Sequence, residues 1–207
     1  WMSLRFFHAR QSSPRGLADA ISVAEPFVAA QPFVVALGDS ILVSQSREPV
    51  LKRMMEVHAR HRPAATIAVE EVPHEAVNRY GIVAPKGDVD GVFAIRDIVE
   101  KPSPSKAPSN LAAAGRYVLE PVIFDAIRRI KPGVGKELQL TDALRLLLKE
   151  GEEIMCVRLR KGEHRLDIGN FLSYFQAFME VSLADREHGA ALRAWVKARL
   201  RGGEKKA

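Results

Sequence analysis

Two aspartates and one lysine stand at positions from which their side chains could do chemistry on phosphates. Asp39 and Asp167 end two apolar segments, in FVVALGDSIL and HRLDIGN, and Lys101 lies between them in VEKP. Two carboxylates that converge on a divalent cation, with a lysine that holds an anionic substrate, are the minimum equipment for moving a nucleotide between phosphates. Simpler interpretations remain open, because Gly-Asp-Ser is ordinary turn composition and most Glu-Lys-Pro lysines are solvated.

Other chemistries find little support in the chain. The six histidines show no zinc-ligand spacing, and Ser40 has no G-x-S-x-G frame around it. Glu70 and Glu71 form another acidic pair, which we interpret as surface or dimer residues at the end of a strand. A zinc enzyme and a serine hydrolase are therefore not expected.

Composition favours one soluble globular domain. The chain has 207 residues, of which 47% are hydrophobic and 27% charged, enough to bury a sizeable core. No apolar run approaches the roughly 18 residues of a membrane span, so we expect no membrane partner. The single cysteine, Cys156, excludes an internal disulfide and suits a reducing cytoplasm. We expect a single domain over 1–207, with a core at 14–184 and a C-terminal helix and basic tail at 185–207.

The net charge of +6 arises largely from that tail. Basic residues near the end of a helix oppose its dipole and solvate an exposed face. No base-stacking aromatic pattern accompanies them, so we expect no nucleic-acid partner.

Strand-like and helix-like segments alternate along the chain. Short apolar or β-branched runs predict strands at 33–37, 65–69, 91–99, 115–119 and 154–159. Apolar residues at helical spacing predict helices at 49–61, 121–130, 141–149, after 170 and around 190–200. This alternation predicts an α/β fold with a mostly parallel sheet. The run at 33–37 is wholly apolar, which is typical of a central strand covered on both faces.

A series of motifs gives the chain a family resemblance. In order, they are RGLADAI, VVALGDSI, VEEVP, NRYGIV, IVEKP, PSNLAAAGRYVL, PGVGKELQLTDAL and LDIGN. From Pro14 to about Leu200 the chain resembles the bacterial UTP-glucose-1-phosphate uridylyltransferases, which are sugar nucleotidyltransferases. The resemblance implies a Rossmann-like sheet flanked by helices, with further helices at the C-terminus. GLADA looks closer to the related thymidylyltransferases, so the base, uridine or thymidine, stays open.

The resemblance also implies roles for individual residues. Asp39 and Asp167 match the two positions that bind the catalytic Mg²⁺, and Lys101 matches the lysine that contacts the sugar phosphate. Glu100 matches the acceptor of hydrogen bonds from sugar hydroxyls, and Gly81 the place where the backbone approaches the sugar ring. The remaining matches are Gly16, which faces the nucleobase with Asp19 nearby in place of a histidine or glutamine, and Asn110, Gly115 and Tyr117, which wall the sugar pocket.

The implied reaction joins UTP and glucose 1-phosphate into UDP-glucose and pyrophosphate. The family opens with a strand and a glycine-rich loop, G-x-G-T-R, and no segment here matches that loop. We therefore expect the chain to be N-terminally truncated, with its first strands missing. An uncovered strand edge near Phe33 would then favour a homo-oligomer. The alternative function is a non-catalytic module that binds a sugar nucleotide or serves in assembly.

Overall fold

A computed structural model describes residues 5–44, 46 and 48–203 of the chain. They form two compact units, of which the first contains the chain up to Leu37 and Ser44–His164. The second contains Gly38–Val43 and the chain from Arg165 onward. The single domain expected over 1–207 stays a prediction.

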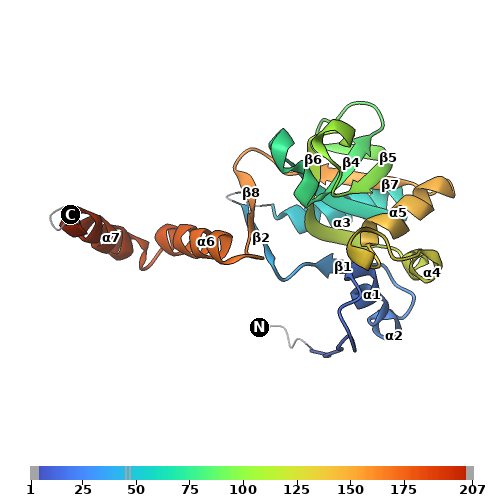
Figure 1. Ribbon diagram of the computed structural model, residues 1–207, viewed down its shortest axis with the longest axis horizontal. Coiled ribbons are helices and arrows are strands. Elements are labelled where there is room, and N and C mark those ends of the chain that lie inside the picture. The colour runs from blue at the N-terminus through green and yellow to red at the C-terminus, as the bar shows by residue number, and fades with distance from the viewer. Residues whose placement is uncertain (1–4, 45, 47, 204–207) are drawn as a thin grey trace. The chain divides into compact units, whose positions relative to one another are not determined.

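A six-stranded sheet is the centre of the first unit (Figure 1). Its strands lie in the order β1-β6-β3-β7-β5-β4. Their bounds are Phe33–Ala36 for β1, Ala65–Glu71 for β3, Gly81–Pro85 for β4, Val92–Glu100 for β5, Leu111–Leu119 for β6 and Ile154–Arg158 for β7. The α/β class is confirmed, and four of the predicted strands, near 65, 91, 115 and 154, lie inside this sheet.

The strand directions correct the expectation of a mostly parallel sheet. Among the described pairings β3 and β7 run parallel, whereas β6 is antiparallel to β1, β3 and β4, and β5 is antiparallel to β4 and β7. The prediction failed because an apolar run reports burial on both faces and not direction. β6 has such a run and is buried along most of its length. The strand predicted at 33–37 exists, but β1 lies at an edge of the described sheet, with Val34 39% exposed.

Helices cover both faces of this sheet. Helix α3 (Val50–His61) lies on the face that carries Thr66, because His58 Nδ1 is 3.0 Å from Thr66 Oγ1. The opposite face packs against α1 (Leu17–Ser22), α4 (Val122–Arg129) and α5 (Leu140–Lys149). The remaining helical segments of this unit are α2 (Glu25–Val28), η1 (His74–Arg79), η2 (Pro104–Lys106) and η3 (Val134–Lys136).

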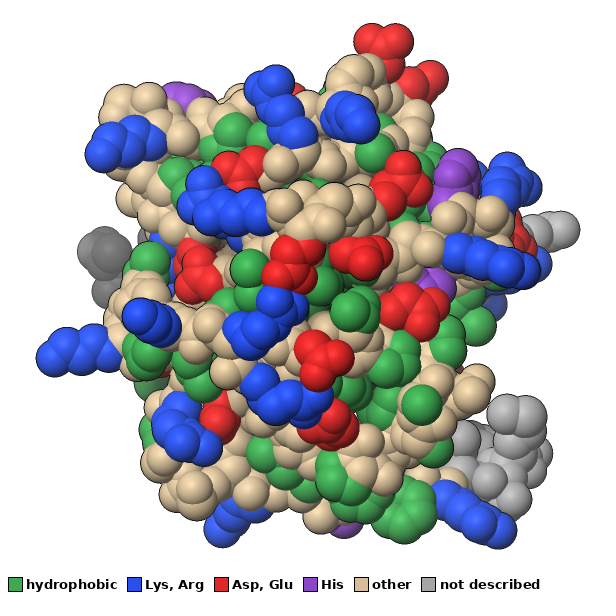
Figure 2. Space-filling model, turned by 90° about the vertical axis from the view of Figure 1, so that its right-hand side faces the viewer, with side chains coloured by type: hydrophobic (Ala, Val, Ile, Leu, Met, Phe, Trp, Pro, Cys, Tyr) green, Lys and Arg blue, Asp and Glu red, His purple; other side chains and the backbone are tan. Residues whose placement is uncertain are grey.

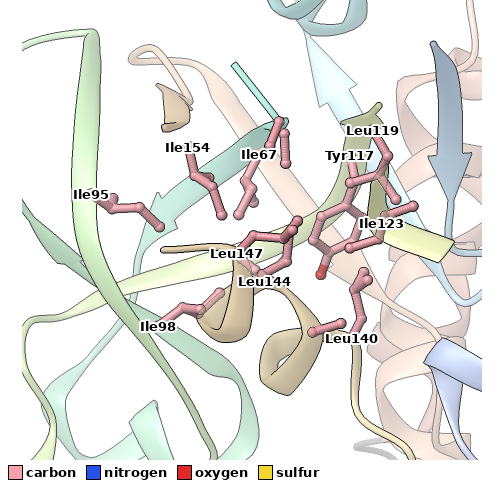
Figure 3. Close-up of a cluster of buried hydrophobic side chains, with 14 of the residues drawn as sticks. Ile67, Ile95, Ile98, Tyr117, Leu119, Ile123, Leu140, Leu144, Leu147 and Ile154 are labelled. Carbon is pink, nitrogen blue, oxygen red and sulfur yellow. The ribbon is translucent and has the colours of Figure 1, made fainter. Parts of the chain in front are cut away.

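Aliphatic side chains from α5 and from the sheet form the hydrophobic core (Figure 3). Leu144 and Leu147 of α5 are fully buried, as are Ile67 and Ile154 of the sheet. Burial of each such side chain contributes roughly 1.5–3 kcal/mol to stability. This packing fixes α5 against the strands that end at the candidate site.

One face of the molecule shows how surface charge is arranged (Figure 2). Basic side chains on this face are interspersed with acidic and hydrophobic ones. Surface ion pairs in the first unit include Arg128 with Glu25 at 2.8 Å and Arg145 with Asp97 at 2.8 Å. Pairs as exposed as these contribute little to stability.

The second unit contains a short two-stranded sheet and two helices. Strand β2 (Ser40–Ser44) pairs with β8 (Glu163–Asp167), and both strands extend across the boundary between the units. Helices α6 (Phe171–Ala184) and α7 (Gly189–Gly203) follow. Asn170 caps α6, since its Oδ1 accepts a hydrogen bond from Ser173 N at 3.0 Å. In the part of the chain that the structure describes, none of the helices is long and apolar enough to cross a membrane.

Candidate functional site

Asp39 and Asp167 are held by a turn of the second unit. Asp167 ends β8, and its Oδ1 accepts a hydrogen bond from the N–H of Gly169 at 2.8 Å. Asp39 directly precedes β2, and its carbonyl oxygen accepts a hydrogen bond from the N–H of Ile168 at 2.8 Å. The paired strands thus bring together two residues that are far apart in the sequence.

Gly169 lies beside both carboxylates. A Cβ atom on Gly169 would lie 3.1 Å from Asp167 Oδ1 and 3.8 Å from Asp39 Oδ2. Both oxygens therefore face the space that the absent side chain leaves free. The described residues contain no group of three or more His, Cys, Asp or Glu that could hold a metal ion. The pair can supply two hard oxygen ligands, which leaves the other positions around a cation to substrate oxygens or water.

A pocket of about 560 Å³ adjoins this turn. Its lining consists of Ile168, Gly169, Asn170, Phe171, Tyr174 and Phe175. Gly169 thus faces both the pocket and the carboxylates. The aromatic side chains give the pocket apolar walls.

Glu100 and Lys101 lie at the end of β5 in the first unit. The Glu100 side chain is 13% exposed and that of Lys101 is 46% exposed, with Lys101 Nζ 3.7 Å from Glu100 Oε1. Lys101 has a φ of 43°, which is uncommon for a residue with a Cβ atom, and its N–H donates to Tyr80 O at 2.9 Å. A strained backbone that tertiary contacts hold in place is a common feature of ligand sites.

Two neighbours fix the Glu100 carboxylate. Gly81 of β4 lies opposite Glu100 in the strand register. Thr141 of α5 donates a hydrogen bond from Oγ1 to Glu100 Oε2 at 3.0 Å. Sequence reasoning missed Thr141, although the motif ELQLTDAL contains it, because its partner lies 41 residues away. We call Gly81, Glu100, Lys101 and Thr141 the Glu100 cluster.

Asn110 and Gly115 lie on β6 or directly before it. Asn110 Oδ1 is 3.0 Å from His74 Nδ1, and the Asn110 carbonyl oxygen accepts a hydrogen bond from Val72 N. Gly115 has a φ of 72°, a conformation that glycine adopts without strain, and its carbonyl oxygen accepts a hydrogen bond from Leu37 N at 3.0 Å. Both residues thus have structural roles within the first unit.

Tyr117 and Gly16 both make close contacts within the first unit, and their predicted roles stay predictions. Tyr117 is 5% exposed and lies in the hydrophobic core near Ile123 (Figure 3). Its apolar ring and its position inside a buried strand explain this placement. At Gly16, with a φ of 106°, a Cβ atom would lie 2.5 Å from Leu138 O. Gly16 therefore permits a close backbone contact within the protein.

Asp19 and Asp142 are further carboxylates in the first unit. Asp19 accepts a hydrogen bond from Gln11 Nε2 at 2.7 Å and forms an ion pair with Arg15 at 2.8 Å. The pKa of Asp142, next to Thr141, is raised, chiefly because burial disfavours its charged form.

Comparisons with known proteins extend this picture. A family model described as "Nucleotidyl transferase" matches residues 3–183. The chain is 44% identical over 177 residues to a UTP–glucose-1-phosphate uridylyltransferase of Streptococcus pyogenes, which covers 84% of this chain and 57% of that protein. The chain thus spans little more than half the length of this relative.

Two solved structures are similar as well. A UDP-glucose pyrophosphorylase complexed with UDP-glucose has a TM-score of 0.76 and 37% identity, over 82% of this chain and 63% of that one. A UTP-bound UGPase from Acinetobacter baumannii has a TM-score of 0.80 and 32% identity, over 91% of this chain and 64% of that one.

Proposed function

Because this chain belongs to the nucleotidyl transferase family, we propose that it takes part in forming UDP-glucose and pyrophosphate from UTP and glucose 1-phosphate. Two observations on similar proteins support this choice of substrates. The S. pyogenes relative is named for this uridylyl transfer, and one similar solved structure holds UDP-glucose.

The position of one oxygen each of Asp39 and Asp167 within 4 Å of a Cβ atom on Gly169 supports the proposal. Carboxylate oxygens are the ligands that Mg²⁺ prefers, and two of them leave room for phosphate oxygens of the substrate. These two residues would hold Mg²⁺, which when bound offsets negative charge on the triphosphate. The small size of Gly169 keeps the space in front of both oxygens open.

Lys101 and Glu100 would bind the sugar phosphate. The ammonium group of Lys101 offsets the charge of the glucose 1-phosphate, and the Glu100 carboxylate accepts hydrogen bonds from sugar hydroxyls. In the transfer, an oxygen of that phosphate attacks the α-phosphorus of UTP. The bond from the α-phosphorus to the oxygen bridging to the β-phosphate breaks, and pyrophosphate leaves with the electron pair. No general base is required, because the attacking phosphate is already ionised.

The proposal also covers the nucleotide base, the cellular location and the oligomeric state of the protein. We favour uridine over thymidine because the similar solved structures hold UDP-glucose and UTP. A cytoplasmic location suits the single cysteine, Cys156, which is buried and free of a disulfide. A homo-oligomer remains a proposal, supported by the edge position of β1 within the described sheet.

Pyrophosphate release tests the proposed function. We expect the protein with Mg²⁺ to release pyrophosphate from UTP and glucose 1-phosphate, and faster with UTP than with dTTP. The double variant Asp39→Asn/Asp167→Asn should lose this activity by a factor of at least about 100. The exposed Asp88→Asn is the matched control and should leave it unchanged. UDP-glucose binding without turnover would support the non-catalytic module, and an active double variant would overturn the metal assignment.

A further inference from the structure

The hydroxyl group of Thr141 serves a distant carboxylate. Thr141 is the second residue of α5 and is 6% exposed. A hydroxyl in the first turn of a helix commonly bonds the backbone of its own turn. Here it donates to Glu100 Oε2 at 3.0 Å, across 41 residues. The bond joins the start of a buried helix to the end of β5.

The methyl group of Thr141 explains why residue 81 is a glycine. A Cβ atom on Gly81 would lie 2.7 Å from Thr141 Cγ2 and 3.4 Å from Glu100 Oε2. The first distance is shorter than any tolerable carbon–carbon contact, so Thr141 fills the space that a side chain at 81 would take. A side chain at residue 81 would therefore collide with the residue that donates to Glu100.

The second oxygen of Glu100 has its own neighbour. Glu100 Oε1 lies 3.7 Å from Lys101 Nζ, while Oε2 accepts the Thr141 hydrogen bond. The Thr141 hydrogen bond to Oε2 restricts rotation of the Glu100 carboxylate about its last bond. Each oxygen still has a lone pair available, since a carboxylate accepts about four hydrogen bonds.

We propose that Thr141 is a positioning residue that aims the Glu100 carboxylate at the sugar hydroxyls and so sets the choice between sugars that differ at one hydroxyl. This inference rests on the proposed function, in which Glu100 binds the sugar. A site built to hydrogen-bond a particular hydroxyl discriminates strongly against an analogue that presents it differently. A carboxylate free to rotate would adapt to either sugar and discriminate less.

Two variants of Thr141 separate its hydroxyl from its shape. Thr141→Val keeps the branched side chain and loses the donor, whereas Thr141→Ser keeps the donor and loses the methyl group. Calorimetric titrations in the presence of Mg²⁺ would measure the affinities of the parent chain and of each variant for UDP-glucose and for UDP-galactose. We expect Thr141→Val to lower the affinity for UDP-glucose about tenfold and the affinity for UDP-galactose by less. The preference for UDP-glucose over UDP-galactose should therefore narrow. Thr141→Ser should stay within about threefold of the parent chain for both sugars.

A double variant shows whether Thr141 acts through Glu100. The double variant Thr141→Val/Glu100→Gln should bind UDP-glucose as tightly as Glu100→Gln alone. The carboxylate that Thr141 positions is already absent in Glu100→Gln, so loss of the Thr141 hydroxyl should have no further effect. Thermal melting would verify that each variant is folded, and Thr141→Ala would replace Thr141→Val if the latter is not.

The outcomes are distinct. A Thr141→Val variant that binds both sugars as the parent chain does, or loses both equally, overturns the inference and leaves the proposed function standing. A parent chain that binds neither sugar nucleotide contradicts the proposed function, and the inference falls with it.

Discussion

The Glu100 cluster and the turn that carries Asp39, Asp167 and Gly169, which we call the aspartate turn, hold their carboxylates by different means. Glu100 is fixed by side chains, with the Thr141 hydroxyl on one oxygen and the Lys101 ammonium group near the other. In the turn that carries Asp39 and Asp167, the backbone N–H of Gly169 bonds the Asp167 carboxylate, and the N–H of Ile168 bonds the backbone carbonyl oxygen of Asp39. The first arrangement depends on packing against the core, and the second on a turn between a strand and a helix. We therefore expect changes in the Glu100 cluster to affect stability or sugar choice, and changes in the turn to affect the metal.

Loss of the lysine should have the largest effect on binding. Lys101→Ala removes the proposed contact to the sugar phosphate and should weaken the free energy of UDP-glucose binding by about 1.5–3 kcal/mol. Stability should change little, since the Lys101 side chain is 46% exposed. Calorimetric titration and thermal melting would measure both quantities, with the exposed Lys106→Ala as control. Equal affinities in the parent chain and in Lys101→Ala would return Lys101 to a solvated loop residue.

A methyl group at residue 81 should test the packing of the Glu100 cluster. Gly81→Ala places a Cβ atom 2.7 Å from Thr141 Cγ2, and such overpacking costs about 1–3 kcal/mol of unfolding free energy. The double variant Gly81→Ala/Thr141→Ser lacks the clashing methyl group and should recover most of that loss. Gly38→Ala, with no atom within 4 Å of the new Cβ, is the control. Urea unfolding would measure all four proteins, and no recovery in the double variant would show that the strain lies elsewhere.

The same change in the aspartate turn should spare stability. At Gly169 a Cβ atom meets Asp167 Oδ1 at 3.1 Å and Asp39 Oδ2 at 3.8 Å, and no apolar side chain lies closer. We expect Gly169→Ala to lower Mg²⁺ affinity several-fold, because the methyl group enters the space in front of both oxygens, while its melting temperature stays close to that of the parent chain. Titration of Mg²⁺ in the presence of UDP-glucose would measure this. A stability loss as large as that of Gly81→Ala would remove the contrast between the two regions.

Asp142 should give the smallest effect, one that depends on pH. Its pKa is raised in the folded protein by burial, so the folded state favours the protonated form. The stability contributed by this group is present below its unfolded pKa and is lost as pH rises through its folded pKa. Asp142→Asn should thus raise the melting temperature by about 1–2 °C at pH 7 and by less at pH 3. A larger gain at pH 3 than at pH 7 would contradict this sign.

Local sequence patterns singled out the two aspartates, but they could not predict strand direction or long-range contacts. Asp39 and Asp167 each occur in a specific motif, so both could be named as candidate metal ligands before the fold was known, and that role stays a prediction. The antiparallel position of β6 could not, because its apolar run is equally typical of a parallel strand. The burial of Tyr117 depends on tertiary packing, and the role of Thr141 depends on a partner 41 residues away.

The central claim is that Asp39 and Asp167 act as one metal site for a sugar nucleotide. The most direct measurement is the affinity of the protein for UDP-glucose, titrated with and without Mg²⁺, in the parent chain and in Asp39→Asn/Asp167→Asn. We predict that Mg²⁺ tightens binding to the parent chain about tenfold or more and has no effect on the double variant. Equal dependence on Mg²⁺ in both proteins, or no binding of UDP-glucose to a folded parent chain, would contradict the account.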